Sequence, residues 1–389
     1  MHSDPLVFSL FVIFAGAALF AALALFAGQS LLIAYIVLGC VVGPWGLGLI
    51  EDPKTIASVG HVGIIFLLFL LGLNMHPQKL LRMLGEAVFV TAVSSTLFAL
   101  VGAAIATLFG FGVRDACLIG ACMMFSSTII GLKLLPTTAL HHRHLGEVII
   151  AVLLLQDLVA IVLLLVVQAM GQESLSALQA LKIAVAPALL AGVAYLAAKR
   201  VLLPLMQRFD TIQEYLFLAA VGWCLAVAQL GHALELSYEM GAFIAGVALA
   251  TNPVSTFIAE SLKPLRDFFL IMFFFSLGAG FDLSRLSDVA VVAMVLGASM
   301  LLLKPWAFRK VLRREQEKIG LAAEAGARLG QISEFSLLVS ALALSSGVMS
   351  DTAAYAVQAA TMITFFLSSY WIVARYPTPI AINARLRRD

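Results

Sequence analysis

Thirteen apolar segments, each about as long as a membrane-spanning helix, limit what this chain can fold into. A helix needs roughly 20 apolar residues to cross a bilayer. Hydrophobic types make up 62% of the 389 residues and charged types 12%, against about 45–50% and about 25% in soluble domains. This composition excludes a soluble enzyme, a nucleic-acid-binding protein and a disordered chain. We therefore expect an all-α polytopic membrane protein with spans at 6–26, 30–50, 55–73, 84–110, 113–136, 144–168, 177–201, 212–232, 236–252, 260–281, 285–308, 318–347 and 351–375.

The distribution of Lys and Arg between alternate loops predicts the orientation. One set of loops holds most of these residues, whereas the other holds only Lys54, Arg114 and Arg285. Basic loops stay in the cytoplasm. With thirteen crossings, the N-terminus is then outside and the C-terminus is cytoplasmic, in a bacterial inner membrane. We expect a transmembrane domain over 1–376, a short cytoplasmic tail over 377–389, and no nucleotide-binding domain.

A weak internal repeat links the two halves of the chain. FLLFLLGLNMHPQKL, which begins at Phe66, matches MFFFSLGAGFDLSRL, which begins at Met272, and places Gly72 on Gly278. Unrelated apolar helices that contain glycine would also match in this way. If the repeat is real, units 6–168 and 212–375 contain six helices each. The single linker helix 177–201 then inverts the second unit, as in many secondary transporters.

Asp157 is the strongest functional candidate because it lies at the middle of a predicted span. About a dozen residues separate it from either end of 144–168, so it cannot reach water by snorkelling. A charge at this depth is costly and is a functional candidate by default. The alternative is an ion pair that only holds helices together. Lys304, which Pro305 follows, is either a partner of Asp157 or a side chain that snorkels to the cytoplasmic surface.

Polar residues also recur at the fifth helix of each proposed unit. Broken transporter helices use such residues to satisfy freed backbone groups, and their helix ends and carbonyls coordinate cations. The alternative is that the hydroxyls bond to their own helices. The residues are Ser126, Ser127 and Thr128 in the first unit, and Arg328, Gln331, Ser333 and Glu334 in the second.

The cysteines and histidines give weaker signals. Cys40, Cys117, Cys122 and Cys224 lie in apolar runs, which favours buried free thiols over disulfides or a metal site. His141, His142 and His144 surround Arg143 in a loop after the fifth span. Histidines can sense pH, although a solvated loop is the simpler interpretation. We expect no cofactor.

Six motifs, taken in order, resemble the monovalent cation–proton antiporter superfamily, and most closely the Kef-type potassium–proton antiporters. They are LGCVVGPWGL (38–47), FLLFLLGL (66–73), FSST (125–128), LLQDLVAI (154–161), FFFSLGAGFDL (273–283) and GQISEF (330–335). The resemblance runs over essentially the whole chain.

The resemblance implies roles for individual residues. Asp157 matches the ion- and proton-binding aspartate, and Gln156 matches the glutamine of Kef-type members. Ser126 to Thr128 and Gln331 to Glu334 match the two crossing unwound helices, and Lys304 matches a basic residue of the preceding helix. The resemblance also implies a homodimer in which a core bundle (spans 4–6 and 11–13) slides against a dimer-forming scaffold (spans 1–3 and 8–10).

Two departures from the Kef-type pattern matter. Such proteins usually continue into a nucleotide-binding regulatory domain, which we do not expect here, so ligand gating does not carry over, and an ungated protein and a separate regulatory subunit are both expectations. GQISEF also lacks the glycine pair expected before Glu334, which leaves the role of that residue open.

The resulting functional hypothesis is antiport by alternating access. Asp157 holds either a proton or one monovalent cation, because burial favours a neutral carboxyl and a cation favours its ionised form. Gln156 and the hydroxyls of the fifth span replace part of the ion's hydration shell. A single carboxylate predicts one-for-one, electroneutral exchange, with K⁺ preferred over Na⁺. The alternatives are Na⁺/H⁺ exchange, a cation channel and an intramembrane enzyme, for which we find no paired carboxylates or metal spacing at depth.

Overall fold

The computed structural model describes residues 5–27, 29–50, 53–74, 77–133, 144–171, 177–234, 236, 238–250, 252–315 and 317–378. Within these ranges every regular element is a helix. Seven helices are long and apolar enough to cross a membrane, and shorter apolar helices accompany them. The prediction of an all-α polytopic membrane protein is therefore confirmed.

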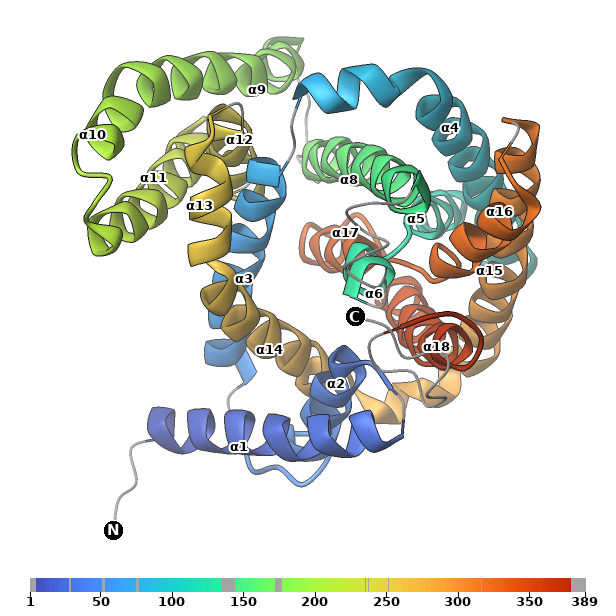
Figure 1. The fold of residues 1–389 in the computed structure, drawn as a ribbon. Coiled ribbons are helices and arrows are strands. Elements are labelled where there is room, and N and C mark those ends of the chain that lie inside the picture. The colour runs from blue at the N-terminus through green and yellow to red at the C-terminus, as the bar shows by residue number, and fades with distance from the viewer. Residues whose placement is uncertain are drawn as a thin grey trace. The chain divides into compact units, whose positions relative to one another are not determined.

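The chain forms two compact units that alternate along the sequence. Unit 1 contains Met1–Val41, Met83–Gly171 and Phe281–Asp389, and unit 2 contains Val42–Arg82 and Gln172–Gly280. The helices that lie wholly or mostly in unit 1 are α1 (Pro5–Phe26), α2 (Leu31–Val42), α4 (Pro77–Leu108), α5 (Val113–Met123), α6 (Thr128–Lys133), α8 (His144–Met170), η2 (Leu283–Arg285), α15 (Leu286–Arg314), α16 (Ile319–Arg328), α17 (Glu334–Ser345) and α18 (Asp351–Arg375) (Figure 1).

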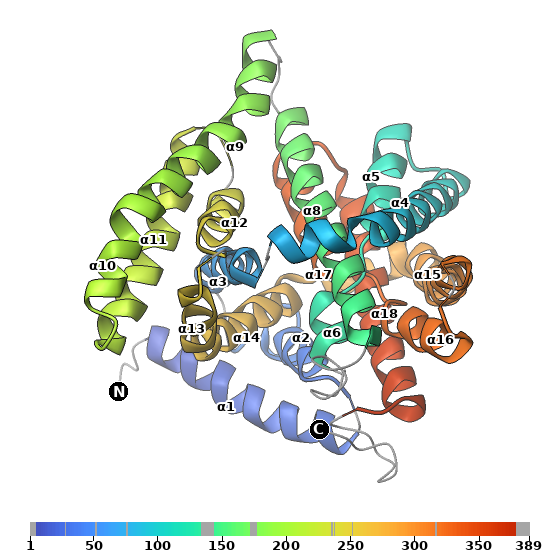
Figure 2. The same cartoon turned by 45° about the horizontal axis from the view of Figure 1, so that its top comes forward.

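Unit 2 is built around α3, which packs against α12 and α14. Gly72 of α3 and Gly246 of α12 allow this close approach, because a Cβ at either residue would collide with the backbone of the other helix. The helices of this unit are α3 (Pro53–Asn74), α9 (Ala177–Ala197), η1 (Ala198–Leu202), α10 (Leu203–Arg208), α11 (Gln213–Ala233), α12 (Tyr238–Leu249), α13 (Val254–Ser261) and α14 (Lys263–Gly280) (Figure 2).

Some predicted spans differ in detail. The helix of span 30–50 ends at Val42, because Gly43 to Gly48 form a turn in which Gly48 has a φ of +65°, a conformation that favours glycine. The span at 177–201 continues through the π-helical segment η1 into α10.

Two spans are interrupted at their centres. The segment 113–136 forms α5, which Met124 ends as its C-cap, a non-helical stretch from Phe125 to Ser127, and then α6. The segment 318–347 forms α16, an irregular stretch from Leu329 to Ser333, and then α17. Both interruptions lie in unit 1, at the positions where the sequence predicted broken helices.

In unit 1, α15 packs against both α16 and α18, and all three lie together in Figure 1. Gly326 permits the contact with α16, because a Cβ there would lie 2.7 Å from the carbonyl oxygen of Pro305. Gly330, within the second interruption, also lies against α15, since a Cβ there would lie 2.9 Å from Cγ of Pro305.

The prediction of buried thiols holds for only part of the set. All four cysteines are free, but Cys117 is exposed and Cys40 is half-buried. An apolar run does not imply burial within a membrane protein, since lipid is also an apolar solvent.

Candidate ion and proton site

Asp157 lies at the middle of α8 and is only 1% exposed. The hydroxyl of Thr128, the first residue of α6, lies 3.2 Å from each of its carboxylate oxygens and donates to them. The interruption of the fifth span thus brings a hydroxyl donor to the buried carboxylate. The structure places these two predicted residues together.

Gln156 faces the backbone of the first interruption rather than an open cavity. Its Oε1 accepts from the backbone N–H of Ser126 at 2.9 Å, and its Nε2 donates to the carbonyl of Met124 at 3.1 Å. Leaving helical geometry strands backbone groups that must find partners in a membrane interior. The amide of Gln156 supplies two of those partners, so its geometry is that of a positioning residue.

The two serines of the first interruption also bond to backbone. Ser126 Oγ donates to the carbonyl of Leu329 at 2.8 Å and so joins the first interruption to the second. Ser127 Oγ accepts from the N–H of Ile130 at 3.1 Å, at the start of α6. Of the three predicted hydroxyls, Thr128 is the one whose bond reaches Asp157.

The second interruption is held through Gln331. Its Nε2 donates to the carbonyls of Ser127 at 3.2 Å and Arg328 at 2.9 Å. Ser333 begins α17 as its N-cap, since its Oγ accepts from Phe335 N–H at 3.1 Å. Gln331 and Ser126 therefore link the two interruptions in both directions.

Lys304 bridges the same two segments from α15. Its ammonium group donates to the carbonyl of Phe125 at 2.5 Å and to that of Gln331 at 3.1 Å, and lies 5.2 Å from the ring centre of Phe98. The side chain is fully buried, so the snorkelling interpretation is wrong. The carbonyls and the ring face compensate part of the cost of burying the charge.

Glu334 adds a second carboxylate to the site. It is the first residue of α17, is 2% exposed, and interacts electrostatically with Asp157. The sequence argument that Asp157 is the one central carboxylate is therefore wrong. The charge balance of exchange has to include both groups.

Arg328 lies at the end of α16 and is also fully buried. Its Nη2 donates to Glu324 at 2.7 Å and to the carbonyl of Pro377 at 2.8 Å. The guanidinium group therefore holds the chain that follows α18 against α16.

Comparison with known proteins identifies the family. Residues 11–374 match the family model described as "Sodium/hydrogen exchanger, transmembrane". The chain belongs to this family. Sodium/hydrogen exchangers are cation–proton antiporters, so the prediction of a multi-pass transporter that exchanges a cation for H⁺, rather than an enzyme, is confirmed.

Curated relatives of this exchanger carry transporter names. It is 25% identical to "Iron transporter MagA" of Paramagnetospirillum magneticum, over the whole chain and 90% of that protein. It is 28% identical to "Glutathione-regulated potassium-efflux system protein KefC" of Escherichia coli and 29% identical to "K(+) efflux antiporter 4" of Arabidopsis thaliana, over 90% and 86% of this chain. The chain spans only 57% and 58% of those two proteins. The resemblance to Kef-type antiporters is confirmed.

The fold also matches a solved structure. The sodium proton antiporter MjNhaP1 from Methanocaldococcus jannaschii superposes with a TM-score of 0.66 at 18% identity, over 94% of this exchanger and 97% of that chain. This similarity supports the polytopic antiporter fold.

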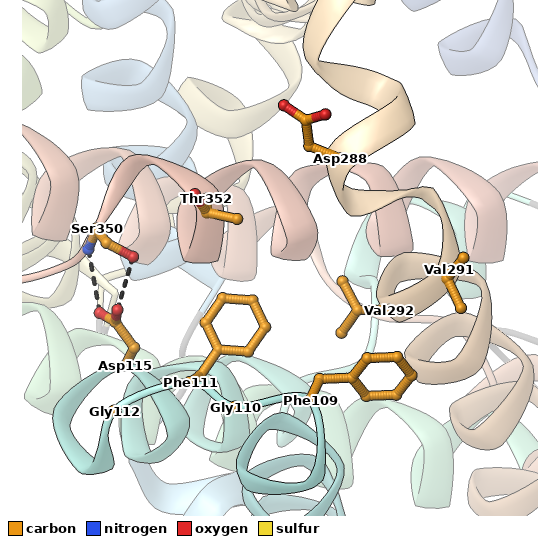
Figure 3. A pocket seen from close by; sticks show the side chains of 10 residues that line it. All are labelled: Phe109, Gly110, Phe111, Gly112, Asp115, Asp288, Val291, Val292, Ser350 and Thr352. Atoms are coloured by element: carbon orange, nitrogen blue, oxygen red, sulfur yellow. Dashed lines mark hydrogen bonds between the residues drawn. The ribbon is translucent and has the colours of Figure 1, made fainter.

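One feature of the described residues stands apart from the site. A cavity of about 410 Å³ lies where α4 joins α5 and where α15 and α18 begin, and Asp115 there holds Ser350 through two hydrogen bonds (Figure 3). None of the predicted site residues lines it. The histidine group of 141–144 falls outside the described residues, apart from the backbone of His144, as do residues 379–389 of the predicted tail.

The sequence analysis missed two buried side chains that contact the second interruption. Thr364 Oγ1 accepts from Ile332 N–H at 3.1 Å, and Ser368 Oγ donates to Gln331 Oε1 at 3.1 Å. Their sequence signal is a row of hydroxyl residues at helical spacing along α18, with Thr361 as its first member.

Proposed function

We propose that this exchanger carries out electroneutral K⁺/H⁺ antiport, with Asp157 as the shared site for the proton and the cation. The observation that carries the proposal is the position of Asp157. It is buried at the middle of α8, beside a helix interruption that supplies the Thr128 hydroxyl. A carboxylate there can hold one proton or one monovalent cation, but not both.

Two observations support K⁺ as the cation. KefC and K(+) efflux antiporter 4 are named for potassium efflux, and Gln156 is the residue that the resemblance associates with Kef-type members. Na⁺ is the alternative within the family, and MjNhaP1 is named as a sodium proton antiporter.

The second carboxylate determines the stoichiometry. Two carboxylates that share a dry site repel each other when both are ionised. We propose that Glu334 keeps its proton through the cycle, while Asp157 alternates between a proton and a cation. One charge then moves in each direction, and the membrane potential does no net work on the exchange.

We further propose an elevator-type movement in which the core helices of 84–168 and 285–375 carry Asp157 from one side of the membrane to the other. The loop charges favour an N-terminus outside and a cytoplasmic C-terminus, in a bacterial inner membrane. A homodimer and a separate regulatory subunit remain predictions from the resemblance.

The test is exchange in liposomes that contain a trapped pH-sensitive dye. K⁺, Na⁺, Rb⁺ or Fe²⁺ is added outside, with and without valinomycin to clamp the potential with K⁺. Wild type is compared with Asp157→Asn and Glu334→Gln. Ser340→Ala is the matched control, because Ser340 is buried but bonds only to its own helix.

Electroneutral K⁺/H⁺ antiport predicts K⁺-driven proton movement that is lost in Asp157→Asn and is insensitive to the clamp. Glu334→Gln should retain clamp-insensitive exchange, since it mimics the protonated acid. Proton movement with Na⁺ alone would contradict the choice of K⁺, and movement with Fe²⁺ alone would favour a cargo like that in the name of MagA. Cation currents without proton movement would favour a channel, and full activity in Asp157→Asn would contradict the site.

A further inference from the structure

The hydroxyl residues of α18 form a row that faces the second helix interruption. Thr361, Thr364 and Ser368 are all fully buried, and their spacing of three and four residues places them on one face of the helix. Hydroxyls in apolar helices often bond only to their own backbone. Thr361 does so, since its Oγ1 donates to the carbonyl of Val357 at 2.8 Å.

Thr364 differs because its hydroxyl serves two elements. Oγ1 donates to the carbonyl of Thr361 at 2.9 Å and accepts from the backbone N–H of Ile332 at 3.1 Å. Ile332 lies in the irregular stretch between α16 and α17, where its N–H has left helical geometry. A donor without a partner at membrane depth costs several kcal/mol, so Thr364 stabilises this backbone conformation.

Ser368 determines how the amide of Gln331 is oriented. Its Oγ donates at 3.1 Å to Gln331 Oε1, and a hydroxyl donor requires the acceptor end of the amide. The amide nitrogen is thereby directed at the carbonyl of Ser127, 3.2 Å away. The next residue, Thr128, donates its hydroxyl to Asp157. A continuous chain of contacts therefore runs from α18 to the carboxylate.

We propose that Thr364 and Ser368 are positioning residues for cation binding at Asp157. Thr364 fixes the backbone of the second interruption, and Ser368 fixes the Gln331 amide that holds the first interruption. Together they set where the Thr128 hydroxyl meets the carboxylate. This inference rests on the proposed function, because it assigns these residues to the same cation site.

The experiment compares variants that remove these contacts with matched controls. Thr364→Val and Ser368→Ala remove the contacts to the second interruption. Thr361→Val and Ser340→Ala are controls, since each removes a buried hydroxyl that bonds only within its own helix. Thr364→Ser retains the hydroxyl and serves as the rescue variant. The readouts are the apparent KM for K⁺, the maximal rate and the ratio of K⁺ to Na⁺ exchange in liposomes.

Ser368→Ala should raise the apparent KM about two- to tenfold, which corresponds to one neutral hydrogen bond. Thr364→Val should raise it roughly five- to a hundredfold, because it leaves a buried N–H without a partner. Both should shift the ratio of K⁺ to Na⁺ exchange, while Thr364→Ser and the two controls remain within about twofold of wild type on the same scale.

Two outcomes would overturn the inference. The first is that both variants have the same apparent KM and the same ion preference as the controls. The second is that only the maximal rate falls, while the KM and the ion preference stay unchanged. If Thr364→Val does not fold, Ser368→Ala measured against Ser340→Ala still decides the question. Wild-type protein without any exchange would instead contradict the proposed function, so the two failures are distinguishable.

Discussion

Replacing Gln156 with Leu tests whether this residue positions the backbone or binds the ion. The side chain is fully buried, and Leu is similar in size but has no polar atoms. The substitution leaves the N–H of Ser126 and the carbonyl of Met124 without their partners. Each stranded buried group costs about 1–3 kcal/mol, so the expected loss of folding free energy is about 2–6 kcal/mol.

The assay is thermal unfolding of purified protein in detergent, followed by intrinsic tryptophan fluorescence. Gln156→Leu should lower the Tm clearly. Asp157→Asn is the matched comparison at the adjacent residue. Because Asn still accepts from the Thr128 hydroxyl and carries no buried charge, its Tm should equal or exceed that of wild type. Both variants should lose K⁺/H⁺ exchange, so stability separates the two roles.

A third variant adds a dependence on pH. Gln156→Glu keeps an acceptor for Ser126 N–H, and a protonated carboxyl can also donate to the carbonyl of Met124. An ionised carboxylate cannot donate and repels that carbonyl. The Tm of this variant should therefore fall as pH rises, relative to wild type. A wild-type Tm in Gln156→Leu, with exchange lost, would refute the positioning role and make Gln156 a direct ligand of the cation.

Three further sets of substitutions test the remaining contacts. Lys304→Gln should have a higher Tm than Lys304→Leu, because an amide still donates to the two carbonyls; equal Tm values would contradict the bridge. Thr128→Val should raise the KM for K⁺ about two- to tenfold with a near wild-type Tm, since one hydrogen bond to Asp157 is lost. Arg328→Leu should lower the Tm more than Arg328→Leu combined with Glu324→Leu, because the single variant strands a partly buried carboxylate. An equal or larger loss of Tm in the double variant would show that the ion pair is not what stabilises this region.

How much of the site the sequence predicts depends on how far each residue lies from a helix end. Asp157 was identifiable because about a dozen apolar residues flank it on each side. Lys304 was ambiguous because it lies nearer to one end of its span. Its burial comes from contacts with residues 179 and 27 positions away in sequence, which no local pattern predicts.

The helix interruptions were predictable as locations but not as hydrogen-bond networks. Serine, glutamine and glycine clusters indicated where the helix would break, and the resemblance paired the two breaks. The sequence could not distinguish a hydroxyl that bonds to its own helix from one that bonds across. Thr361 and Thr364 illustrate the difference, since they are one turn apart on α18 and only Thr364 reaches Ile332.

Glu334 shows the limit of counting charges by depth. Its position at the start of α17 placed it among helix-break residues in the sequence analysis. Because the helix breaks near the middle of the predicted span, the first residue of the new helix is buried and close enough to Asp157 to interact with it electrostatically. The sequence argument therefore counted one buried carboxylic acid, whereas the structure buries two, Asp157 and Glu334.

The side chains that hold the backbone of the two interruptions in place, here called the brace, are different from the residues that exchange ions in the proposed site. The brace consists of Gln156, Ser126, Gln331 and Lys304. Carbonyl oxygens of unwound helices are often available to cations, but here side-chain donors already face five of them. The positive end of a donor N–H or O–H on a carbonyl oxygen repels a cation that approaches the same oxygen. In the proposed site the cation is then left mainly with the carboxylate of Asp157, the Thr128 hydroxyl and its own water. Substitutions in the brace should therefore change stability and affinity together, whereas substitutions of Asp157 should abolish exchange without loss of stability. The five carbonyls are those of Met124, Phe125, Ser127, Leu329 and Gln331.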